Sequence, residues 1–350
     1  MLSAVPGDVT MTKELRIGLL GYGYWGPNYA RVLSELAEVE LAGICEAAPE
    51  RLRRAAQRYP HVALCRTVEE LLQLPRLDAV VISTSAATHF PLAQAVLASG
   101  RHVLVEKPLA LRIEDCERLI ELAARQQKIL MVAHTFVYNA GIQRMKHEMR
   151  REEFGRIYYL HATRTNLGPI RMDVNAIWDL APHDISIFNY LLDEQPQWVS
   201  AVGTCVLENP REDVGFLTLG YRNGVIGNIH VSWADPNKVR EVVAVGSQRR
   251  VVFNDLNDLE RVRVYEKGVS VGDRTAESYG EFKLLVRDGD IISPHIDPSE
   301  PLKNQCMEFL ESIQQQRRPL TDGEFGAQVV RVLLAADASL RAGGQRQEIR

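Results

Sequence analysis

The chain has 350 residues, of which 46% are hydrophobic and 25% are charged. A chain of this length and composition is expected to fold as two domains with cores of their own, and it does not belong to the disordered class. Its 41 basic and 45 acidic residues leave a net charge of −4. Neither nucleic acid nor a membrane surface is therefore expected as a partner, since no overall electrostatic attraction to phosphates exists.

The five cysteines are scattered along the sequence and include no Cys-x-x-Cys pair. This pattern argues against a disulfide framework and a zinc site, so we expect reduced thiols and no bound metal. No stretch approaches the roughly 18 apolar residues of a membrane-spanning helix. Residues 1–13 lack the basic start and apolar middle of a secretion signal. We therefore predict a cytoplasmic protein in which residues 1–13 form a flexible arm.

Short apolar runs alternate with segments of helical period between residues 15 and 135. Such alternation predicts a doubly wound parallel sheet, a Rossmann domain, over residues 14–137. Thr88 is a candidate N-cap, and Gly100 a candidate helix terminator. The expected strands are 15–20, 39–45, 62–65, 79–82, 102–105 and 129–132, and the expected helices are 28–36, 50–58, 91–98 and 113–125.

The pattern changes after Asn139, where a helix (142–152) precedes a run (157–165) that alternates like a strand with one solvated face. Asn223-Gly224 between two apolar runs, 217–221 and 225–232, predicts a β-hairpin. Residues 138–350 are therefore expected to form a substrate-binding α+β domain with a largely antiparallel open sheet. Its other expected elements are strands 239–245 and 250–253, loops 256–260 and 268–280, and helices 302–315 and 326–341.

A glycine turn, Gly21-x-Gly23-x-x-Gly26, joins the first predicted strand to the first predicted helix and contains Tyr24 and Trp25. The first glycine allows a tight bend, the second lets the backbone approach a pyrophosphate, and the third lets helix and strand pack closely. The helix N-terminus offers amide donors and a partial positive charge to phosphates. Because the turn lies between a strand and a helix, it predicts a dinucleotide site.

Glu46 follows the second predicted strand, twenty residues after Gly26. A carboxylate at this place accepts hydrogen bonds from the adenosine ribose and repels a 2′-phosphate, which favours NAD over NADP. Arg51, Arg53 and Arg54 lie downstream, where they would attract such a phosphate. A merely solvated Glu46 is the alternative.

Two later segments are expected at the same edge of the sheet, because each follows a predicted strand. Ser83, Thr84 and His89 would line the cofactor site, with turn formation and helix capping as their alternative roles. Glu106 and Lys107 follow the fifth strand, and the ammonium of Lys107 would stabilise negative charge that develops on a substrate oxygen. A solvated lysine is the alternative. With the glycine turn, this lysine predicts an oxidoreductase.

Asp179 and His183 are four residues apart at the start of a predicted helix, so they share a face. An imidazole that titrates near neutral pH takes up or delivers the hydroxyl proton of an alcohol, and a neighbouring carboxylate orients it. On the residues alone, a capping Asp and a core His are the stronger interpretation.

Three motifs together resemble the Gfo/Idh/MocA family of sugar oxidoreductases over nearly the whole chain: Gly21-x-Gly23-x-x-Gly26, Glu106-Lys107-Pro108 and Asp179-x-x-x-His183. The resemblance implies that Lys107, Asp179 and His183 meet at the nicotinamide and are catalytic. It also implies that the sheets of the second domain pair into homodimers or homotetramers.

Four further segments resemble the branch of this family that oxidises nucleotide-activated sugars at C3: Tyr22-Gly23-Tyr24-Trp25-Gly26-Pro27-Asn28, Ala133-His134-Thr135-Phe136, Asp173-Val174-Asn175-Ala176-Ile177-Trp178-Asp179 and His230-Val231-Ser232-Trp233. This resemblance implies UDP-N-acetylglucosamine or its uronic acid as substrate. It also implies a sugar aminotransferase as the next enzyme in making 3-amino sugars for surface polysaccharide.

Residues that precede or open the catalytic helix are candidates for binding the substrate, together with Lys107 and His183. Arg164 and Arg171 would bind the pyrophosphate, and Trp178 offers an aromatic surface for sugar or uracil. A structural role, with Arg164 on a solvated sheet face and Trp178 in the core, stays open. The full set is Arg164, Asn166, Arg171, Asn175 and Trp178.

We therefore expect an NAD-dependent dehydrogenase of nucleotide-activated hexoses, with His183 as base, Asp179 orienting it and Lys107 polarising the oxygen. A sugar 3-ketoreductase or an inositol-type dehydrogenase of the same fold is the first alternative. A cofactor sensor or scaffold that binds NAD without turnover is the second.

Overall fold

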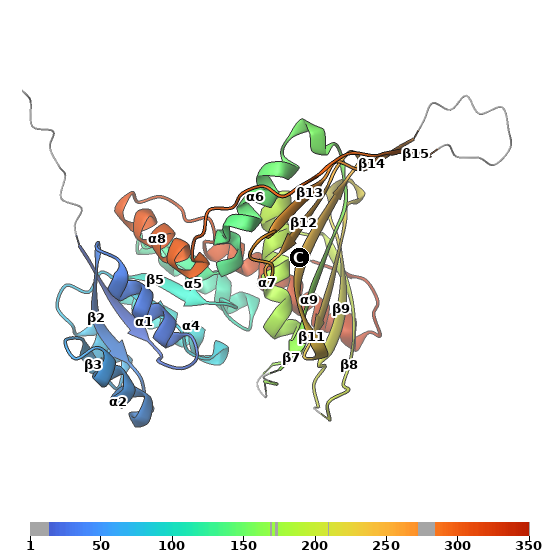
Figure 1. Cartoon of the computed structure of the whole chain (residues 1–350). Helices are drawn as coiled ribbons and strands as arrows, with labels where there is room; N and C mark the ends of the chain where they lie inside the picture. Colours follow the sequence, from blue (N-terminus) through green and yellow to red (C-terminus); the bar gives the residue numbers. More distant parts are fainter. Residues whose placement is uncertain (1–13, 169, 172–173, 209, 272–283, 350) are drawn as a thin grey trace, which may run out of the picture. The chain divides into compact units, whose positions relative to one another are not determined.

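The computed structural model describes residues 14–168, 170–171, 174–208, 210–271 and 284–349 (Figure 1). The arm expected at residues 1–13 lies outside these ranges. The chain forms two compact units, the first from residues 14–106, Arg118–Met131 and Cys306–Pro319, and the second from Lys107–Glu117, Val132–Gln305 and Leu320–Arg350. Since each unit combines separate segments, the domain division expected after residue 137 stays a prediction.

The first sheet is parallel, with strand order β3-β2-β1-β4-β5-β6. The order turns back beside β1, which is the doubly wound arrangement, so the predicted Rossmann fold is confirmed. Every residue of β4 is buried, as expected for a strand covered on both faces. The elements are β1 Leu15–Leu20, α1 Gly26–Glu35, β2 Val39–Cys45, α2 Pro49–Arg58, β3 Ala63–Cys65, α3 Val68–Leu72, β4 Ala79–Ile82, α4 Ala86–Ala98, β5 His102–Glu106, α5 Ile113–Arg125 and β6 Leu130–Ala133.

The start of α4 differs from the prediction. The helix begins at Ala86 after Ser85, so Thr88 lies inside the first turn and is not the N-cap. Its hydroxyl lies 2.7 Å from Thr84 Oγ1 and 2.8 Å from the carbonyl oxygen of Ser85. Gly100 follows the helix with a φ of +79°, as a helix terminator requires.

The second unit is built on a nine-stranded sheet of order β16-β13-β12-β11-β7-β10-β9-β8-β17. β7 and β10 are parallel and the other neighbouring strands of this sheet are antiparallel, which confirms the predicted α+β fold with a largely antiparallel sheet. The hairpin between β9 and β10 is also confirmed: Asn223 and Gly224 have φ values of 59° and 77°. Two left-handed residues at the turn match the twist of the strands.

The elements after β6 in the chain are η1 Thr135–Tyr138, α6 Ala140–Met149, η2 Glu152–Phe154, β7 Ile157–Leu167, α7 Ala176–Leu192, β8 Trp198–Thr204, β9 Val214–Gly220, η3 Arg222–Gly224, β10 Ile226–Ser232, β11 Ala234–Gly246, β12 Arg250–Asn254, β13 Val262–Tyr265, β14 Gly268–Val271, β15 Leu284–Arg287, β16 Ile291–Ile292, α8 Pro301–Gln314, α9 Gly323–Arg341 and β17 Gln347–Glu348. β14 pairs with β15, so the loop predicted at 268–280 is wrong for its first four residues. The rest of that segment, residues 272–280, lies outside the described residues. The four residues alternate a valine with a small residue, a pattern that suits a strand.

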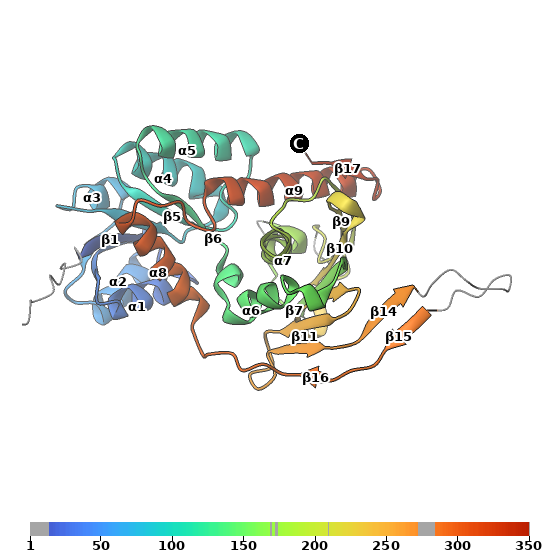
Figure 2. The same ribbon diagram turned by 90° about the horizontal axis from the view of Figure 1, so that it is seen from above.

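One face of the nine-stranded sheet packs against α6, α7 and α9 in a single core, and Figure 2 shows α7 and α9 on this face. Strand alternation leaves the other face open, where Tyr159, Val202 and Phe216 are 46%, 50% and 44% exposed. The ring of Phe216 stacks on His230 with centroids 4.3 Å apart. The predicted solvated face of β7 is therefore confirmed, and it carries exposed apolar side chains.

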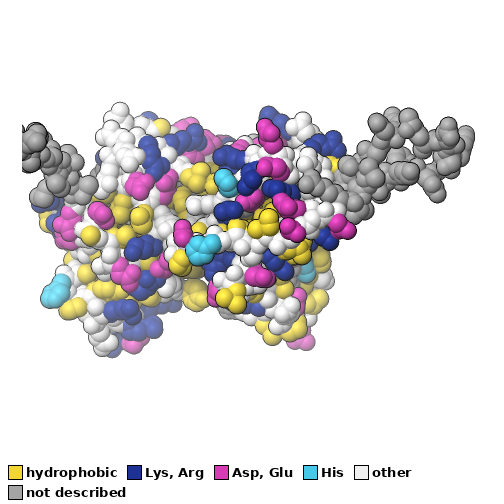
Figure 3. All heavy atoms as spheres, turned by 45° about the horizontal axis from the view of Figure 1, so that its top comes forward, with side chains coloured by type: hydrophobic (Ala, Val, Ile, Leu, Met, Phe, Trp, Pro, Cys, Tyr) yellow, Lys and Arg dark blue, Asp and Glu magenta, His cyan; other side chains and the backbone are white. Residues whose placement is uncertain are grey.

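No helix in the described ranges is long and apolar enough to cross a bilayer. Figure 3 shows acidic and basic side chains interspersed on the face it presents. Four cysteines are buried and Cys205 is exposed.

Candidate active site

The glycine turn between β1 and α1 has the geometry that a dinucleotide requires. Gly21 has a φ of +93°, and a Cβ there would lie 3.0 Å from the carbonyl of Ser83. A Cβ on Gly26 would lie 2.4 Å from the oxygen of Gly21, whereas the nearest atom to a Cβ on Gly23 is 3.5 Å away. No side chain caps the N-terminus of α1. The turn is therefore close-packed at Gly21 and Gly26 and open at Gly23. The end of the helix offers amide donors to a pyrophosphate.

Glu46 follows β2 immediately and is held there by the backbone. Its two carboxylate oxygens accept hydrogen bonds from the amides of Tyr22 and Ala48, each at 2.8 Å. A carboxylate accepts about four hydrogen bonds, so capacity remains for ribose hydroxyls. Of the three downstream arginines, Arg51 approaches Glu46, with Nη1 at 3.9 Å. These contacts fit a ribose-binding carboxylate.

Ser83 and His89 make polar contacts that hold the loop after β4 in place. Ser83 is buried and its hydroxyl donates to the carbonyl of Gly21 at 2.9 Å. His89 is 1% exposed, with Nε2 3.2 Å from the carbonyl oxygen of Thr84. The expectation that His89 lines the site is therefore not met, because the helix start at Ala86 turns its ring into the core. Thr84 is partly exposed and remains a lining candidate.

Tyr24 and Trp25 project from the turn, being 84% and 40% exposed, and their rings pack edge to face at 5.9 Å. Glu106, by contrast, is buried and accepts a hydrogen bond from the hydroxyl of Tyr29 at 2.7 Å. Glu106 thus connects the end of β5 to α1, and Lys107 remains the catalytic candidate of the pair.

Lys107 and Asp179 lie together, as the motifs imply. The ammonium of Lys107 donates to the carbonyl oxygen of Asp179 at 2.8 Å and lies 3.6 Å from Oδ1 of the same residue. Arg171 Nη1 donates to Oδ1 of Asp179 at 3.1 Å, and Trp233 Nε1 donates to Oδ2 at 3.3 Å. The carboxylate therefore receives donors on both oxygens.

His183 lies one turn beyond Asp179 on α7, but the two side chains share no hydrogen bond in the described part of the chain. The ring of His183 packs against Phe136, with centroids 5.1 Å apart, and its Nδ1 is buried without a partner there. The prediction that Asp179 orients His183 is therefore not met, because the carboxylate turns to cationic and indole donors instead.

The surroundings of His183 keep its imidazole neutral. Burial lowers the pKa of His183 well below its ordinary value, and the positive charges of Lys107, Arg164 and Arg240 lower it further, as does His134. His183 is therefore unprotonated at neutral pH, which is the form that a general base has before it takes a proton.

Arg164 has a different role from either interpretation of the sequence. It lies on the packed face of β7, only 4% exposed, and forms a bidentate ion pair with Asp184 of α7, with both contacts at 2.8 Å. Its guanidinium also lies over the ring of Phe136, 4.3 Å from the centroid. The twofold strand period places residue 164 with Leu160 and Ala162 toward the core. Arg164 thus fastens α7 to the sheet and is not placed for a phosphate.

His134 lies in a segment that resembles the sugar-oxidising branch, but the sequence predicts no role for it. It follows β6 directly, is 1% exposed, and has no hydrogen-bond partner on either ring nitrogen within the described residues. Burial, with the charge of Lys107, lowers the pKa of His134 to about 3. The same rule that located Lys107, a polar residue directly after a buried parallel strand, is the signal for His134.

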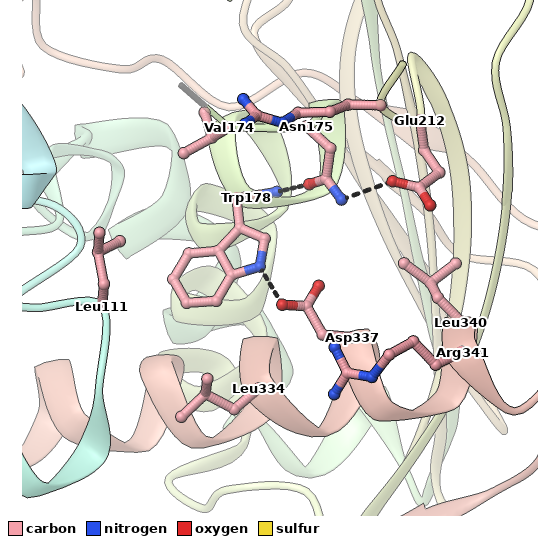
Figure 4. A pocket seen from close by; sticks show the side chains of 10 residues that line it. Leu111, Val174, Asn175, Trp178, Glu212, Leu334, Asp337, Leu340 and Arg341 are labelled. Atoms are coloured by element: carbon pink, nitrogen blue, oxygen red, sulfur yellow. Dashed lines mark hydrogen bonds between the residues drawn. The ribbon is translucent and has the colours of Figure 1, made fainter. Parts of the chain in front are cut away.

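Asn175 and Trp178 line a cavity of about 470 Å³ between the start of α7 and the end of α9 (Figure 4). Asn175 caps α7 and donates to Glu212 at 2.9 Å, and Trp178 Nε1 donates to Asp337 at 2.9 Å. Their polar groups are thus paired within the cavity wall, which fits the structural alternative. Asn166 Nδ2 donates to the carbonyl of Gly168 at 3.3 Å.

Two family descriptions match the chain: "Oxidoreductase family, NAD-binding Rossmann fold" over residues 15–134 and "GFO/IDH/MocA C-terminal domain" over residues 142–252. UDP-N-acetylglucosamine 3-dehydrogenase of Acidithiobacillus ferrooxidans is 26% identical over 335 residues, 95% of this chain and 99% of the relative. A solved structure of that enzyme covers 95% and 99% of the two chains with a TM-score of 0.80 at 25% identity.

Other relatives carry different names. Myo-inositol 2-dehydrogenase of Thermotoga maritima is 24% identical over 337 residues, 93% of this chain and 96% of the relative. The WlbA dehydrogenase of Bordetella pertussis, solved with NADH and UDP-GlcNAcA, shares the fold with a TM-score of 0.78 at 23% identity, covering 97% and 99% of the two chains. This chain belongs to the Gfo/Idh/MocA family of oxidoreductases, NAD(P)-dependent dehydrogenases that act on CH–OH groups.

Proposed function

We propose that this protein oxidises the C3 hydroxyl of a nucleotide-activated hexose, UDP-N-acetylglucosamine or its uronic acid, with NAD as the electron acceptor. The observation that carries the proposal is the ammonium of Lys107, held 2.8 Å from Asp179 on the helix that also carries the neutral His183. A cation for the developing oxyanion and a base for the proton are what alcohol oxidation requires.

The reaction removes a hydride from C3 and a proton from its hydroxyl, leaving a ketone. NAD, when bound, supplies the hydride acceptor. His183 takes the proton at Nε2, because its Nδ1 is buried. Lys107 donates a hydrogen bond to the substrate oxygen and stabilises the negative charge that builds there as the proton leaves. In the reverse direction His183 returns the proton, so the same groups serve a 3-ketoreductase.

Support for a nucleotide-activated substrate comes from the Acidithiobacillus relative, which matches this chain over nearly its full length. Arg171 is partly exposed beside Asp179, and we assign it to a substrate phosphate, with Asn166 as a further polar contact. The inositol dehydrogenase relative supports the alternative, a free polyol as substrate. Glu46 supports NAD over NADP, because its fixed carboxylate would face a 2′-phosphate.

The proposal is tested by offering the purified protein UDP-, TDP- and GDP-sugars, free hexoses and myo-inositol, with NAD or NADP, and following reduced nicotinamide by absorbance. We expect turnover with UDP-N-acetylglucosamine or its uronic acid and NAD. Turnover of inositol alone would replace the proposal by its alternative. NADH binding without turnover of any alcohol would support the non-catalytic sensor.

We also propose that the open face of the nine-stranded sheet forms a homo-oligomer, since Tyr159, Val202 and Phe216 are exposed on it. A 3-keto sugar is a substrate for transamination, so a sugar aminotransferase is the partner we propose for the next step. A cytoplasmic location remains part of this proposal.

A further inference from the structure

Trp233, between β10 and β11, is a buried residue whose indole reaches the chemical centre. It is 1% exposed, and its Nε1 donates to Oδ2 of Asp179 at 3.3 Å. The backbone of Trp233 is held on both sides: its amide donates to the carbonyl of Asp213 at 2.8 Å, and its carbonyl accepts from Gly168 at 3.2 Å. The indole N–H is thus a donor in a fixed place.

Asp179 is the residue that this donor fixes. The terminal torsion of an aspartate is broad, so a carboxylate with donors on one oxygen alone is free to rotate. Here Arg171 contacts Oδ1 and Trp233 contacts Oδ2. The two donors contact different oxygens of the carboxylate, and of the two Trp233 is the fully buried one.

The ammonium of Lys107 depends on the same residue. It donates to the carbonyl oxygen of Asp179 and lies 3.6 Å from Oδ1. No hydrogen bond connects Asp179 to His183 in the described ranges, where Asp179 instead has three cationic or indole donors around it. The contacts of Asp179 therefore serve Lys107.

We propose that Trp233 is a positioning residue: its indole N–H fixes the carboxylate of Asp179, which in turn holds the ammonium of Lys107 at the substrate oxygen. The inference rests on the proposed function for the role of Lys107, and it reassigns Asp179 from orienting the base to anchoring the lysine. The indole is suited to this task because it is a donor only and is held rigidly by its burial.

The test is Trp233→Phe, which keeps an aromatic ring and deletes the N–H. We expect kcat to fall about tenfold with NADH affinity unchanged, in line with the loss of one hydrogen bond to a charged group. Trp198→Phe, on β8 with its ring under Arg346, is the matched control and should change neither quantity.

A second measurement does not depend on the substrate. The rate at which an amine-reactive reagent labels Lys107, read by peptide mass spectrometry at fixed pH, should rise several-fold in Trp233→Phe and not in Trp198→Phe, since the lysine is only 10% exposed while Asp179 holds it. An inactive wild type would sink the proposed function and leave this comparison intact. Unchanged labelling in a folded Trp233→Phe protein, with or without a lowered Tm, would overturn the positioning role.

Discussion

The glycine turn and the surroundings of Lys107 differ in the hydrogen-bond partners of their polar side chains. At the turn, partners are backbone groups: Glu46 accepts from the amides of Tyr22 and Ala48, and Ser83 donates to the carbonyl of Gly21. Beside Lys107, which also donates to the backbone carbonyl of Asp179, the carboxylate of Asp179 is contacted by side chains from separate segments of the second unit: those of Lys107, Arg171 and Trp233.

The two regions also differ in how completely their polar groups are paired. Glu46 has a partner on each oxygen, whereas His134 and His183 keep buried ring nitrogens without a partner in the described residues. A buried unpaired group costs about 1–3 kcal/mol. The carboxylate of Glu46 is thus paired as it stands, whereas the two histidines are not, and a catalytic role is one of the explanations for a buried polar group without a partner.

The largest expected effect comes from removing the base. His183→Asn should lower kcat by roughly 10²- to 10⁴-fold, the usual contribution of general-base catalysis, and leave NADH binding unchanged. Steady-state kinetics on the accepted alcohol and NADH fluorescence titration measure the two quantities. His161→Asn, on the open face of β7, is the control. A kcat within twofold of wild type would show that the proton leaves by another route.

Removing the lysine is expected to have the next largest effect. Lys107→Ala should lower kcat at least about a hundredfold, because one electrostatic contributor to the oxyanion is lost. The affinity for NADH should stay nearly the same, as titration will show, and Lys128→Ala serves as control. A rate equal to that of the wild type would show that Lys107 takes no part in the mechanism. The region around Lys107 would then differ from the glycine turn in its contacts only and not in catalysis.

A smaller change is expected at the backbone-paired region. Glu46→Ala should lower the preference for NAD over NADP by roughly tenfold, since the carboxylate no longer repels a 2′-phosphate. Glu46→Gln keeps an acceptor for the amide of Tyr22 but loses the negative charge, and it should also lower the preference for NAD. The effect of the charge is thereby separated from an effect on folding. Glu50→Ala is an exposed control. If the ratio of NAD affinity to NADP affinity is the same in Glu46→Ala and in the wild type, the ribose is held elsewhere.

The last prediction concerns stability in acid and not catalysis. His134, whose pKa is lowered to about 3 by burial and Lys107, binds a proton below about pH 6.5 when unfolded but stays neutral when folded. Stability should therefore fall as pH drops from about 6.5 to 3, by up to about 1.4 kcal/mol per pH unit for this one group. Chemical denaturation at several pH values measures the slope.

His134→Leu should flatten that slope, since it removes the titrating group. His295→Leu, at an exposed histidine, is the matched control and should leave the slope as it is. An unchanged slope in His134→Leu would mean that His102 and His183, whose pKa values are also lowered, account for the acid sensitivity.

Much of the fold follows from local pattern. The strands near Leu15–Leu20 and Val39–Cys45 agree with their predicted bounds, because buried parallel strands are continuous apolar runs. Two predictions from local residue type are wrong. Thr88 is a residue type that caps helices, but α4 starts at Ala86. Gly268–Val271 has glycine and polar neighbours, which predict a loop, but it forms a short strand.

The site was less predictable than the fold. The motifs predict Lys107, Asp179 and His183 as the catalytic groups, but they do not predict which of the three pair, since a spacing of four on a helix indicates a shared face and no contact. Arg164 was expected at a phosphate or in solvent, yet it pairs with Asp184 in the core. Its partner lies twenty residues away in the sequence, and no local pattern connects the two.

The sequence by itself determined the parallel sheet, the glycine turn, the hairpin at Asn223-Gly224 and the residue types available for chemistry, because periodicity and backbone conformation act over a few residues. Only the tertiary structure decided that Trp233 and Arg171 donate to the carboxylate of Asp179, that Lys107 donates to its carbonyl, and that the ring nitrogens of His134 are buried without a partner among the described residues. Such contacts depend on where strands and helices far apart in the chain come to lie, and side-chain hydrogen bonds form only within about 3.5 Å, a distance that sequence patterns do not specify.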